Sequence, residues 1–342
     1  MTMRTVIVDR YGPPEVARVA EVPTPEPGAG EVRVRVAASV VGAADAAMRS
    51  GRPRVVRLAA GFRRPRNPVP GGDFAGVVDA LGVGATRFAV GDRVHGTLAP
   101  ASGANAESVV IAEDAAVAPT PPGLDDAEAV AIVDGFLTAL PFLRDLGRVG
   151  DGDEVLVVGA AGSVGSSAVQ LAHAFGARVT AVTSTSHLEL VRSLGADVVI
   201  DRTAGRPQDA AVAAAPTAAA RGRSGAAGYD VVFDAVGAWG FRSARTLLGP
   251  RGVYLTTVPD PVVLLLAGPT ALLRRRRAAI AFTGLRKAAA KREDLELLGR
   301  LVAERRFRPV IDSVLPLDQV AEAYRRVDGG RKAGAVVLVS DG

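Results

Sequence analysis

The feature that most constrains this chain is a glycine-rich turn between a short aliphatic segment and an apolar, helix-like segment. The turn reads Val155-Leu-Val-Val-Gly159-Ala-Ala-Gly162-Ser-Val-Gly165. Glycines let a backbone approach a ligand closely, and the N-terminus of the next helix presents free N–H groups to an anion. The spacing is G-x-x-G-x-x-G instead of G-x-G-x-x-G. Because it opens a strand–helix–strand unit, it still predicts a site for the pyrophosphate of a dinucleotide.

Aliphatic strands alternate with helices from this turn onward. We expect strands at residues 154–158, 178–183, 198–200, 231–233 and 252–258, and helices at 163–175 and 187–194. Continuous aliphatic strands that alternate with helices form a parallel sheet covered on both faces. The fold class is therefore α/β, with a doubly wound, Rossmann-type parallel sheet.

The segments on either side of this region have β character. We expect strands at 4–8, 31–37, 76–80, 93–97, 108–111, 309–315 and 335–339, with a helix at 317–327. Short strands separated by Gly- and Pro-rich turns predict a small β-barrel. A chain of 342 residues suits two domains. We expect a discontinuous barrel domain of residues 1–124 and 293–342 around a Rossmann domain of residues 125–292, which begins with a helix capped by Asp125.

The end of the second strand of the Rossmann domain bears on the choice of dinucleotide. An Asp or Glu there would hydrogen-bond the adenosine ribose and repel a 2′-phosphate. This strand ends in Thr183-Ser-Thr-Ser-His187 without an acidic residue, and Arg202 follows the third strand. Hydroxyl groups and a guanidinium can donate to a phosphate, which favours NADPH over NADH. The alternative is that residues 183–186 only cap the next helix.

Motifs along nearly the whole chain resemble one enzyme family. They include VLVVGAAGSVGSSAVQLAHAFGARV, HLELVRSLGADVVID, PVPGGDFAGVVDALGVGATRFAVGDRV and GYDVVFDAVG. With these motifs the chain resembles the zinc-independent medium-chain dehydrogenases/reductases, and within them the quinone oxidoreductase and enoyl reductase branch. The resemblance implies a Rossmann NADP-binding domain inserted into a GroES-like β-barrel catalytic domain.

The metal ligands of the zinc-dependent relatives are missing. Those relatives carry a catalytic Cys and a Gly-His-Glu segment, and the matching positions here are Gly42, Gly72 and Asp73. The chain contains no cysteine, so it offers no thiolate ligand. We therefore expect no metal. Without a Lewis acid an unactivated alcohol is hard to oxidise, whereas an electron-poor C=C bond can accept hydride and delocalise the resulting charge.

The resemblance also implies which residues meet the cofactor. Thr138 would lie beside the nicotinamide and the phosphates. The strand ends at Val236, Gly237 and 256–258 would face the nicotinamide. Residues 161–164 of the glycine turn would line the pyrophosphate. Ser184, Ser186 and Arg202 would meet the 2′-phosphate. The full set of expected cofactor residues is Thr138, Gly159, Ala161, Gly162, Ser163, Val164, Gly165, Thr183, Ser184, Ser186, Arg202, Val236, Gly237, Thr256, Thr257 and Val258.

Catalytic residues are not identified by these motifs. The candidates to line the substrate cleft are Gly42, Asp45, Arg49, His95 and Asp134. Asp45 is equally suited to capping a helix. The family's frequent Asn near the nicotinamide aligns with Gly42, and no proton donor is evident, so solvent would protonate the product.

These observations predict an NADPH-dependent reductase that transfers hydride to a conjugated C=C bond or a quinone without zinc. The acceptor would be a small molecule or a thioester. Two alternatives stay open. One is a zinc-free carbonyl or alcohol oxidoreductase, and the other is a non-catalytic NADPH-binding protein.

Charge and hydropathy restrict the partners. The formal net charge is +5, and arginines cluster at 52–66 and 274–277. Aromatic residues for base stacking are nearly absent there, so these clusters do not indicate a nucleic-acid partner. The most apolar stretch, 258–273, is short and interrupted by prolines, so we expect no membrane insertion. A cytoplasmic homodimer is the expectation, the dimer by analogy with the family.

Overall fold

The computed structural model describes residues 1–217, 227–273 and 275–340. Arg274, in the second arginine cluster, lies outside the described residues. The chain divides into two compact units, one of Met1–Asp134 with Gly284–Gly342 and the other of Gly135–Thr283. We call them the barrel unit and the Rossmann unit. As expected, the barrel unit is discontinuous in sequence, but both of its boundaries lie about ten residues from the expected ones.

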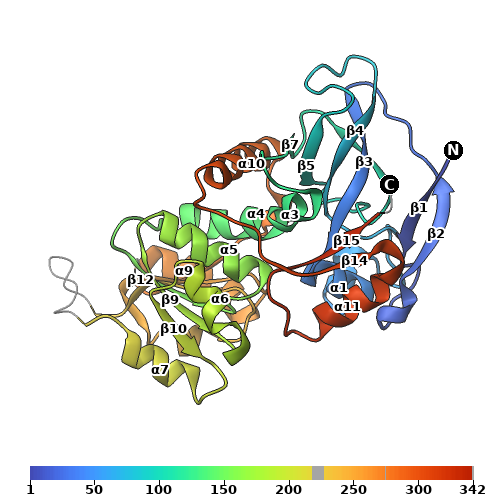
Figure 1. The fold of residues 1–342 in the computed structure, drawn as a ribbon. Helices are drawn as coiled ribbons and strands as arrows, with labels where there is room; N and C mark the ends of the chain where they lie inside the picture. Colours follow the sequence, from blue (N-terminus) through green and yellow to red (C-terminus); the bar gives the residue numbers. More distant parts are fainter. Residues whose placement is uncertain (218–226, 274, 341–342) are drawn as a thin grey trace. The chain divides into compact units, whose positions relative to one another are not determined.

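The Rossmann unit contains a six-stranded parallel sheet in the order β10-β9-β8-β11-β12-β13 (Figure 1). Numbered from β8, this order is 3-2-1-4-5-6, the arrangement of a doubly wound dinucleotide-binding sheet. The α/β fold class is confirmed. The strands are β8 (Glu154–Val158), β9 (Arg178–Thr183), β10 (Val198–Asp201), β11 (Tyr229–Asp234), β12 (Leu248–Thr256) and β13 (Arg277–Ile280).

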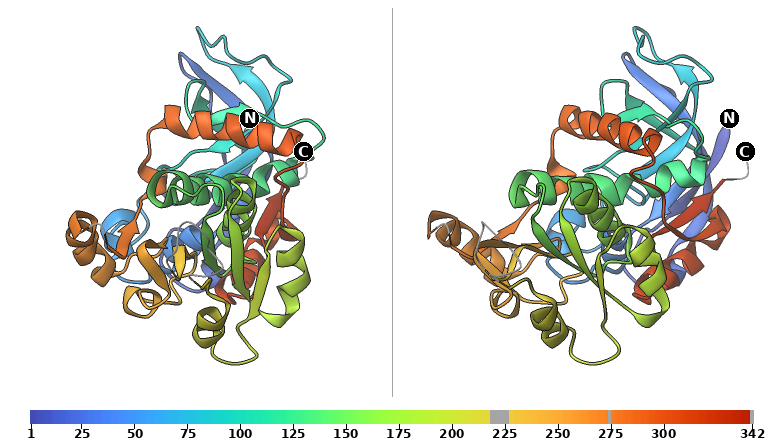
Figure 2. Two further views of the ribbon diagram at one scale, coloured as in Figure 1. Left: turned by 90° about the vertical axis from the view of Figure 1, so that its left-hand side faces the viewer. Right: turned by 60° about the vertical axis from the view of Figure 1, so that its left-hand side comes forward.

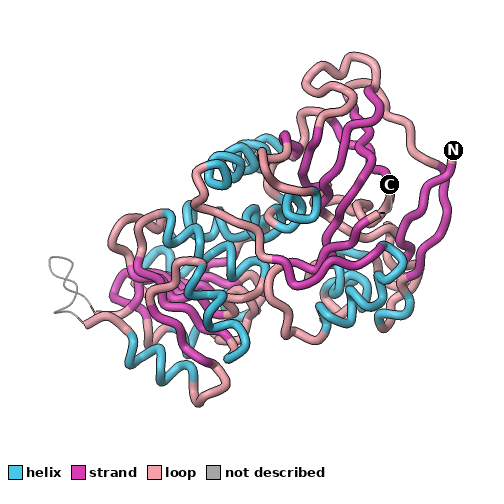
Figure 3. The backbone as a smooth tube through the Cα atoms, in the orientation of Figure 1, coloured by secondary structure: helices cyan, strands magenta, loops and turns pink. Residues whose placement is uncertain are grey.

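Helices cover both faces of this sheet, as the alternation of side chains along β11 shows. Phe233 packs on Phe142, with ring centroids 5.3 Å apart. Its neighbour Val232 points to the other face, into a cluster with Phe241 and Val263. Figure 2 shows the surrounding helices from two other directions, and Figure 3 shows helices in cyan in the orientation of Figure 1. They are α4 (Val133–Pro141), η2 (Phe142–Gly147), α5 (Ser163–Ala174), η3 (Thr185–His187), α6 (Leu188–Ser193), α7 (Pro207–Ala214), α8 (Phe241–Ala244) and α9 (Pro261–Leu273).

The barrel unit is built on a seven-stranded sheet, with β14-β15-β3-β4-β5-β7 in order and β6 paired to β3. Only β14 and β15 run parallel; the other neighbours are antiparallel. A separate hairpin joins β1 to β2. The strands are β1 (Thr2–Ile7), β2 (Arg18–Pro23), β3 (Glu31–Val41), β4 (Asp73–Leu81), β5 (Arg93–Thr97), β6 (Ser108–Ala112), β7 (Val117–Pro119), β14 (Ile311–Pro316) and β15 (Ala335–Val339).

The helices of the barrel unit explain why the boundary falls after residue 134. Asp125 caps α3 as expected: its Oδ1 accepts the N–H of Glu128 at 2.8 Å. The apolar face of α3 then packs on β3 and β15 instead of joining the Rossmann unit. The helices of this unit are η1 (Pro14–Val16), α1 (Ala43–Ser50), α2 (Val56–Ala60), α3 (Asp126–Ala131), η5 (Thr283–Leu285), α10 (Ala288–Ala303), η6 (Leu317–Gln319) and α11 (Val320–Asp328).

The apolar stretch that the sequence analysis set aside as too short for a membrane forms α9, a helix that contains Pro269. Val263 of this helix is buried against the sheet, whereas Leu265 is exposed. Among the described residues, no helix combines the length and the hydropathy needed to cross a bilayer.

Candidate functional site

The glycine turn lies between β8 and α5, at the point where the strand order of the sheet reverses. Gly159 leaves the strand with φ +79°, a left-handed conformation that favours glycine. Gly162 is the N-cap of α5, and its N–H donates to the carbonyl of Gly159 at 3.1 Å. A Cβ on Gly165 would come closer than 3.0 Å to that same carbonyl oxygen. The absence of a side chain at Gly165 therefore lets α5 begin directly against the strand.

The N-terminus of α5 is also approached by α4. A Cβ on Gly135 would come within 3.0 Å of the Ser163 carbonyl and of the Ser167 hydroxyl, so the two helices are in close contact at this point. Thr138 is one helical turn after Gly135 and is partly exposed. Residues i and i+3 share a helix face, which places Thr138 on the side of α4 that meets the first turn of α5. The sequence analysis included Thr138 but missed Gly135.

The carboxyl ends of β8, β11 and β12 come together in a small apolar surface. Val236 packs over Gly159, and Gly237, with φ +66°, packs against Val258. The side chains of Val236 and Val258 are 53% and 43% exposed, which is high for valine at the end of a buried strand. Both are therefore available to a planar, apolar ligand group.

A buried carboxylate that the sequence analysis missed shapes this surface. Asp234 ends β11 and is fully buried. It accepts the backbone N–H groups of residues 236, 238 and 239 at 3.2, 3.1 and 2.6 Å, and the hydroxyl of Tyr254 at 3.1 Å. Four donors on one carboxylate fix the turn after the strand. An Asp at a strand end followed by Gly at the third position was the available sequence signal.

Two of the expected cofactor residues are buried, and a third, Thr257, is partly exposed and hydrogen-bonded within the protein. Thr183 and Thr256 are 3% and 1% exposed. Thr256 Oγ1 accepts the N–H of Val258 at 3.2 Å, and Thr257 Oγ1 donates to the carbonyl of Ala235 at 3.0 Å. The hydroxyls of Thr256 and Thr257 hold the loop after β12 in place, and burial keeps the side chain of Thr183 away from a ligand.

Polar residues follow the ends of β9 and β10, which pair side by side with Thr183 opposite Asp201. The hydroxyls of Ser184 and Ser186 are 3.2 Å apart, and the exposed Arg202 has its N–H on the carbonyl of Thr183 at 2.8 Å. In the described part of the chain, no ion pair engages the guanidinium of Arg202.

Asp201 adds a negative charge to this group. Its carboxylate accepts the hydroxyl of Thr185 at 2.6 Å and both the N–H and the hydroxyl of Thr203, at 2.8 and 2.6 Å. The hydrogen bonds from Thr185 and Thr203 lower the pKa of Asp201, so it stays ionised. Three hydrogen bonds direct this carboxylate toward the two threonines.

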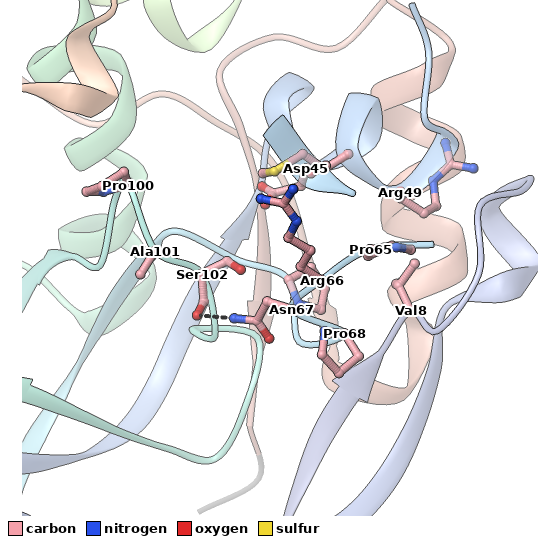
Figure 4. A pocket seen from close by; sticks show the side chains of 13 residues that line it. Val8, Asp45, Arg49, Pro65, Arg66, Asn67, Pro68, Pro100, Ala101 and Ser102 are labelled. Carbon is pink, nitrogen blue, oxygen red and sulfur yellow. Dashed lines mark hydrogen bonds between the residues drawn. The ribbon is translucent and has the colours of Figure 1, made fainter. Parts of the chain in front are cut away.

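A pocket of about 320 Å³ lies within the barrel unit (Figure 4). It contains two of the expected substrate residues, Asp45 and Arg49. The other lining residues are Val8, Met48, Ala60, Pro65, Arg66, Asn67, Pro68, Pro70, Pro100, Ala101 and Ser102. Prolines and short apolar side chains make most of the wall rigid and non-polar, which is typical of a site for a small organic molecule.

Asp45 both caps a helix and lines this pocket, so the two roles left open by the sequence coexist. Its Oδ2 accepts the N–H of Gly42 at 2.8 Å, and its Oδ1 accepts the N–H of Gly71 at 3.1 Å. Burial raises the pKa of Asp45 to about 6, against the lowering effect of these two hydrogen bonds. Gly42 thus supports Asp45 through its backbone.

Arg49 is not available to a ligand, contrary to expectation. It is 3% exposed, and its guanidinium donates to the carbonyl of Gly12 and to Asp328, both at 2.6 Å. The same group lies 4.9 Å from the ring centre of Tyr324. The guanidinium joins α1 to α11, and Figure 4 shows it turned away from the labelled pocket residues.

Asp134 acts electrostatically on both Asp45 and Asp73. Burial, together with the charge of Asp134, raises the pKa of Asp73 well above its ordinary value. Asp134 also raises the pKa of Asp45. The structure therefore brings Gly42, Asp45 and Asp134 to one region. Gly42 and Gly72 have no side chain with which to ligate a metal, so the zinc ligand set of the relatives does not fit these positions.

The prediction that His95 touches the substrate is wrong. His95 lies in the middle of β5, between Ala75 of β4 and Ala118 of β7, and has no exposed surface. Burial lowers its pKa to about 4, which keeps the ring neutral at ordinary pH. His95 lies inside the expected strand 93–97, but the strand pattern alone does not show which face of the strand meets the core.

Comparisons with known proteins agree with this architecture. The alcohol dehydrogenase GroES-like domain matches residues 28–122, and the zinc-binding dehydrogenase domain matches residues 194–338. A 2-methylene-furan-3-one reductase from Solanum lycopersicum is 30% identical over 96% of this chain and 76% of its own length. This chain belongs to the medium-chain dehydrogenase/reductase family. It is an NAD(P)H-dependent oxidoreductase of the quinone oxidoreductase-like branch.

Other relatives and solved structures support the same branch. Quinone-oxidoreductase QR1 from Triphysaria versicolor is 29% identical, with 98% of each chain covered. The pikromycin polyketide synthase component PikAII from Streptomyces venezuelae is 33% identical over 93% of this chain, which spans only 8% of that protein. The quinone oxidoreductase structure from Coxiella burnetii has a TM-score of 0.84 at 25% identity, with 99% of each chain covered. A mycobacterial protein complexed with NADPH has a TM-score of 0.79 at 26% identity, with 98% of this chain and 99% of that chain covered.

The two glycines at the start of α5 should respond differently to alanine. Gly165→Ala forces a Cβ against the Gly159 carbonyl, so we expect a loss of at least about 2 kcal/mol of stability. Gly162→Ala meets nothing closer than 3.6 Å and keeps an ordinary φ of −68°, so the fold should tolerate it. Chemical denaturation and cofactor titration would compare them. A Gly162→Ala variant that is stable but binds NADPH normally would contradict close backbone approach to the pyrophosphate.

His95 should make the protein sensitive to acid. Its pKa is about 4 in the folded state and about 6.5 in the unfolded chain. The folded-state pKa is the lower one, so this contribution is complete above pH 6.5 and is lost as the pH falls toward 4, by roughly 3 kcal/mol. His95→Leu should flatten the unfolding free energy over this range, measured by denaturation at several pH values. His173→Gln, which leaves His95 in place, should retain the wild-type profile. Equal acid sensitivity in His95→Leu would refute this assignment.

Proposed function

We propose that this chain is an NADPH-dependent reductase that transfers hydride to a conjugated C=C bond or a quinone without zinc. The observation that carries the proposal is the compact glycine turn at the reversal point of the parallel sheet, directly before α5. Ligands of doubly wound sheets bind at this reversal point, outside the carboxyl ends of the strands.

The residues around this turn suit a dinucleotide. Residues 163–165 begin α5, where backbone N–H groups lack partners within the helix and attract a pyrophosphate. Val236 and Val258 would pack against the nicotinamide and keep water away from it. When bound, NADPH supplies the hydride, while the protein orients both reactants. The mycobacterial neighbour complexed with NADPH supports this cofactor.

Ser184, Ser186 and Arg202 would bind the 2′-phosphate that distinguishes NADPH from NADH. Their donors lie at the neighbouring ends of β9 and β10, and Arg202 has no competing ion pair among the described residues. Asp201 is the opposing charge, but its oxygens are occupied by Thr185 and Thr203. This arrangement supports a preference for NADPH.

The reaction type follows from the residues that replace the zinc ligands. Gly42 and Gly72 cannot hold a Lewis acid, so an acceptor must stabilise the incoming electron pair itself. Conjugated carbonyl compounds and quinones do so by delocalising the charge onto oxygen. We propose that hydride adds to the β-carbon, that hydrogen bonds stabilise the enolate, and that a proton from solvent completes the reduction.

The barrel-unit pocket would hold the acceptor, with Asp45 in its wall. A cytoplasmic location, a homodimeric assembly and a small-molecule or thioester substrate stay predictions from the sequence. No residue is assigned as the catalytic acid.

A panel of acceptors tests the proposed reaction. Purified protein with NADPH should reduce phenanthrenequinone, a simple enone or an enoyl thioester, followed by the loss of NADPH absorbance. Plain ketones should be poor acceptors because they cannot delocalise the charge. Turnover of plain ketones alone would favour a carbonyl reductase. NADPH binding without turnover of any acceptor would favour a non-catalytic protein.

Arg202→Ala tests the cofactor preference. Loss of a charged hydrogen bond to the 2′-phosphate should raise the KM for NADPH by roughly 10- to 100-fold and leave the KM for NADH nearly unchanged. Arg206→Ala removes another exposed arginine of the same unit and is the matched control. Steady-state kinetics with both cofactors gives the comparison. An equal effect on NADPH and NADH would contradict a role in 2′-phosphate recognition.

A further inference from the structure

One segment of the barrel unit concentrates positive charge. Residues 46–72 contain seven arginines and no lysine, aspartate or glutamate. The formal charge of this segment is +7, whereas the whole chain carries +5, so the rest of the chain carries 5 − 7 = −2. The net excess of positive charge therefore lies in α1, α2 and the loops around them, although a second arginine cluster lies at 274–277.

Most of these arginines have no structural partner. Arg49 is buried and paired with Asp328, and Arg57 lies 4.6 Å from the ring centre of Tyr11. The remaining five are exposed, and no ion pair forms between them and any acidic group of the described residues: Arg52, Arg54, Arg63, Arg64 and Arg66. Like charges within one segment repel one another, and these five arginines have no opposite charge of the described residues to offset that repulsion.

Arg66 belongs both to this charged segment and to the wall of the pocket. It is a lining residue, and Figure 4 shows its side chain extending through the pocket in the direction of Asp45. Two other polar side chains of the wall, Asn67 and Asp45, are engaged by hydrogen bonds. Asn67 donates to the carbonyl of Ser102 at 2.9 Å and accepts the N–H of Val69 at 3.1 Å, and both oxygens of Asp45 accept backbone N–H groups.

The guanidinium of Arg66 differs from these groups. In the described structure it has neither an ion pair nor a side-chain hydrogen bond, although its backbone N–H donates to Ala60 at 2.7 Å. Its planar donors match the two oxygens of a carboxylate or the oxygens of a phosphate. Met48, Pro68 and Pro100 supply an apolar wall around it.

We propose that this pocket binds an acceptor that carries an anionic group, a carboxylate or a phosphate, and that Arg66 is the residue that recognises this group. The proposal rests on the proposed reductase function and names its substrate class. The apolar wall holds the body of the acceptor, and the four other exposed arginines attract the anion from solution. This attraction weakens with added salt, because exposed charges are screened.

Matched pairs of acceptors test the proposal. The first pair is para-carboxybenzalacetone and its methyl ester, which share one enone and differ in one charge far from the reacting bond. The second pair is crotonyl coenzyme A and crotonyl N-acetylcysteamine, which share one enoyl thioester, and of which only the coenzyme A ester carries phosphates, together with adenosine and the rest of the pantetheine arm. The variants are Arg66→Gln, which removes the charge, and Arg66→Lys, which keeps it. Arg300→Gln removes an exposed arginine of α10 that does not line the pocket.

In at least one pair, Arg66→Gln should raise the KM for the anionic member about tenfold and change the KM for the neutral member less than about twofold. Arg66→Lys should restore part of the loss, and Arg300→Gln should behave as wild type. The pair that responds distinguishes a carboxylate from a phosphate. Equal changes for charged and neutral members, or no change in either pair, would overturn the proposal.

A binding measurement separates this proposal from the reductase function. Para-carboxybenzylacetone is the saturated analogue of the first acid and cannot accept hydride at a C=C bond, and butyryl coenzyme A is the analogue for the phosphate arm. If no acceptor is turned over, the proposed function fails. Calorimetric binding of either analogue that weakens in Arg66→Gln would then still support the anion site. Binding of neither analogue, or binding of equal strength in Arg66→Gln, would overturn the anion site itself.

Discussion

The contact between the Gly159 carbonyl and the first turn of α5 at Gly165 is the constraint on which the Rossmann unit depends. A strand and a helix can meet this closely only when neither presents a side chain. The approach fixes where α5 starts, and therefore where its unpaired N–H groups point. Gly135 brings α4 to the same place, and Val236 closes over Gly159 from the end of β11. The cofactor residues are thus positioned by backbone contacts more than by side-chain hydrogen bonds.

The regular elements of this unit could be predicted because their sequence signals are local. β8 and β9 have the expected bounds, since a run of aliphatic residues ends at a glycine or a polar turn. The wrong predictions concern the direction in which a side chain points or the partner on which a segment packs. His95 follows the alternation of its strand into the core, and Arg49 turns toward Asp328, which is 279 residues away in sequence. Residues 125–134 pack on β3 and β15 because α3 matches their apolar surface. Each of these outcomes depends on long-range packing that a single sequence does not encode in a readable pattern.

Three carboxylates, two of them buried, have different roles in the protein. Asp234 accepts four donors, so it stabilises one turn geometry and has no capacity left for a ligand. Asp45 accepts two backbone donors but lies in the pocket wall with a pKa of about 6, so its charge varies near neutral pH. Asp201 remains ionised and is held by threonine hydroxyls. The number of hydrogen-bond donors to each carboxylate, rather than its position in a motif, separates carboxylates with a structural role from those whose charge can change near neutral pH.

Five of the seven arginines of residues 46–72 are exposed and form no ion pair with the described acidic groups. An exposed ion pair contributes little to stability, so leaving Arg66 unpaired costs the protein little. Repulsion among five exposed cations is a cost that the fold alone does not offset. An anion bound beside them would reduce that repulsion and gain planar hydrogen bonds from Arg66 at the same time. Part of the free energy of such binding would come from the reduced repulsion among these arginines. We therefore expect a charged acceptor to bind this pocket more tightly than a neutral one of the same shape.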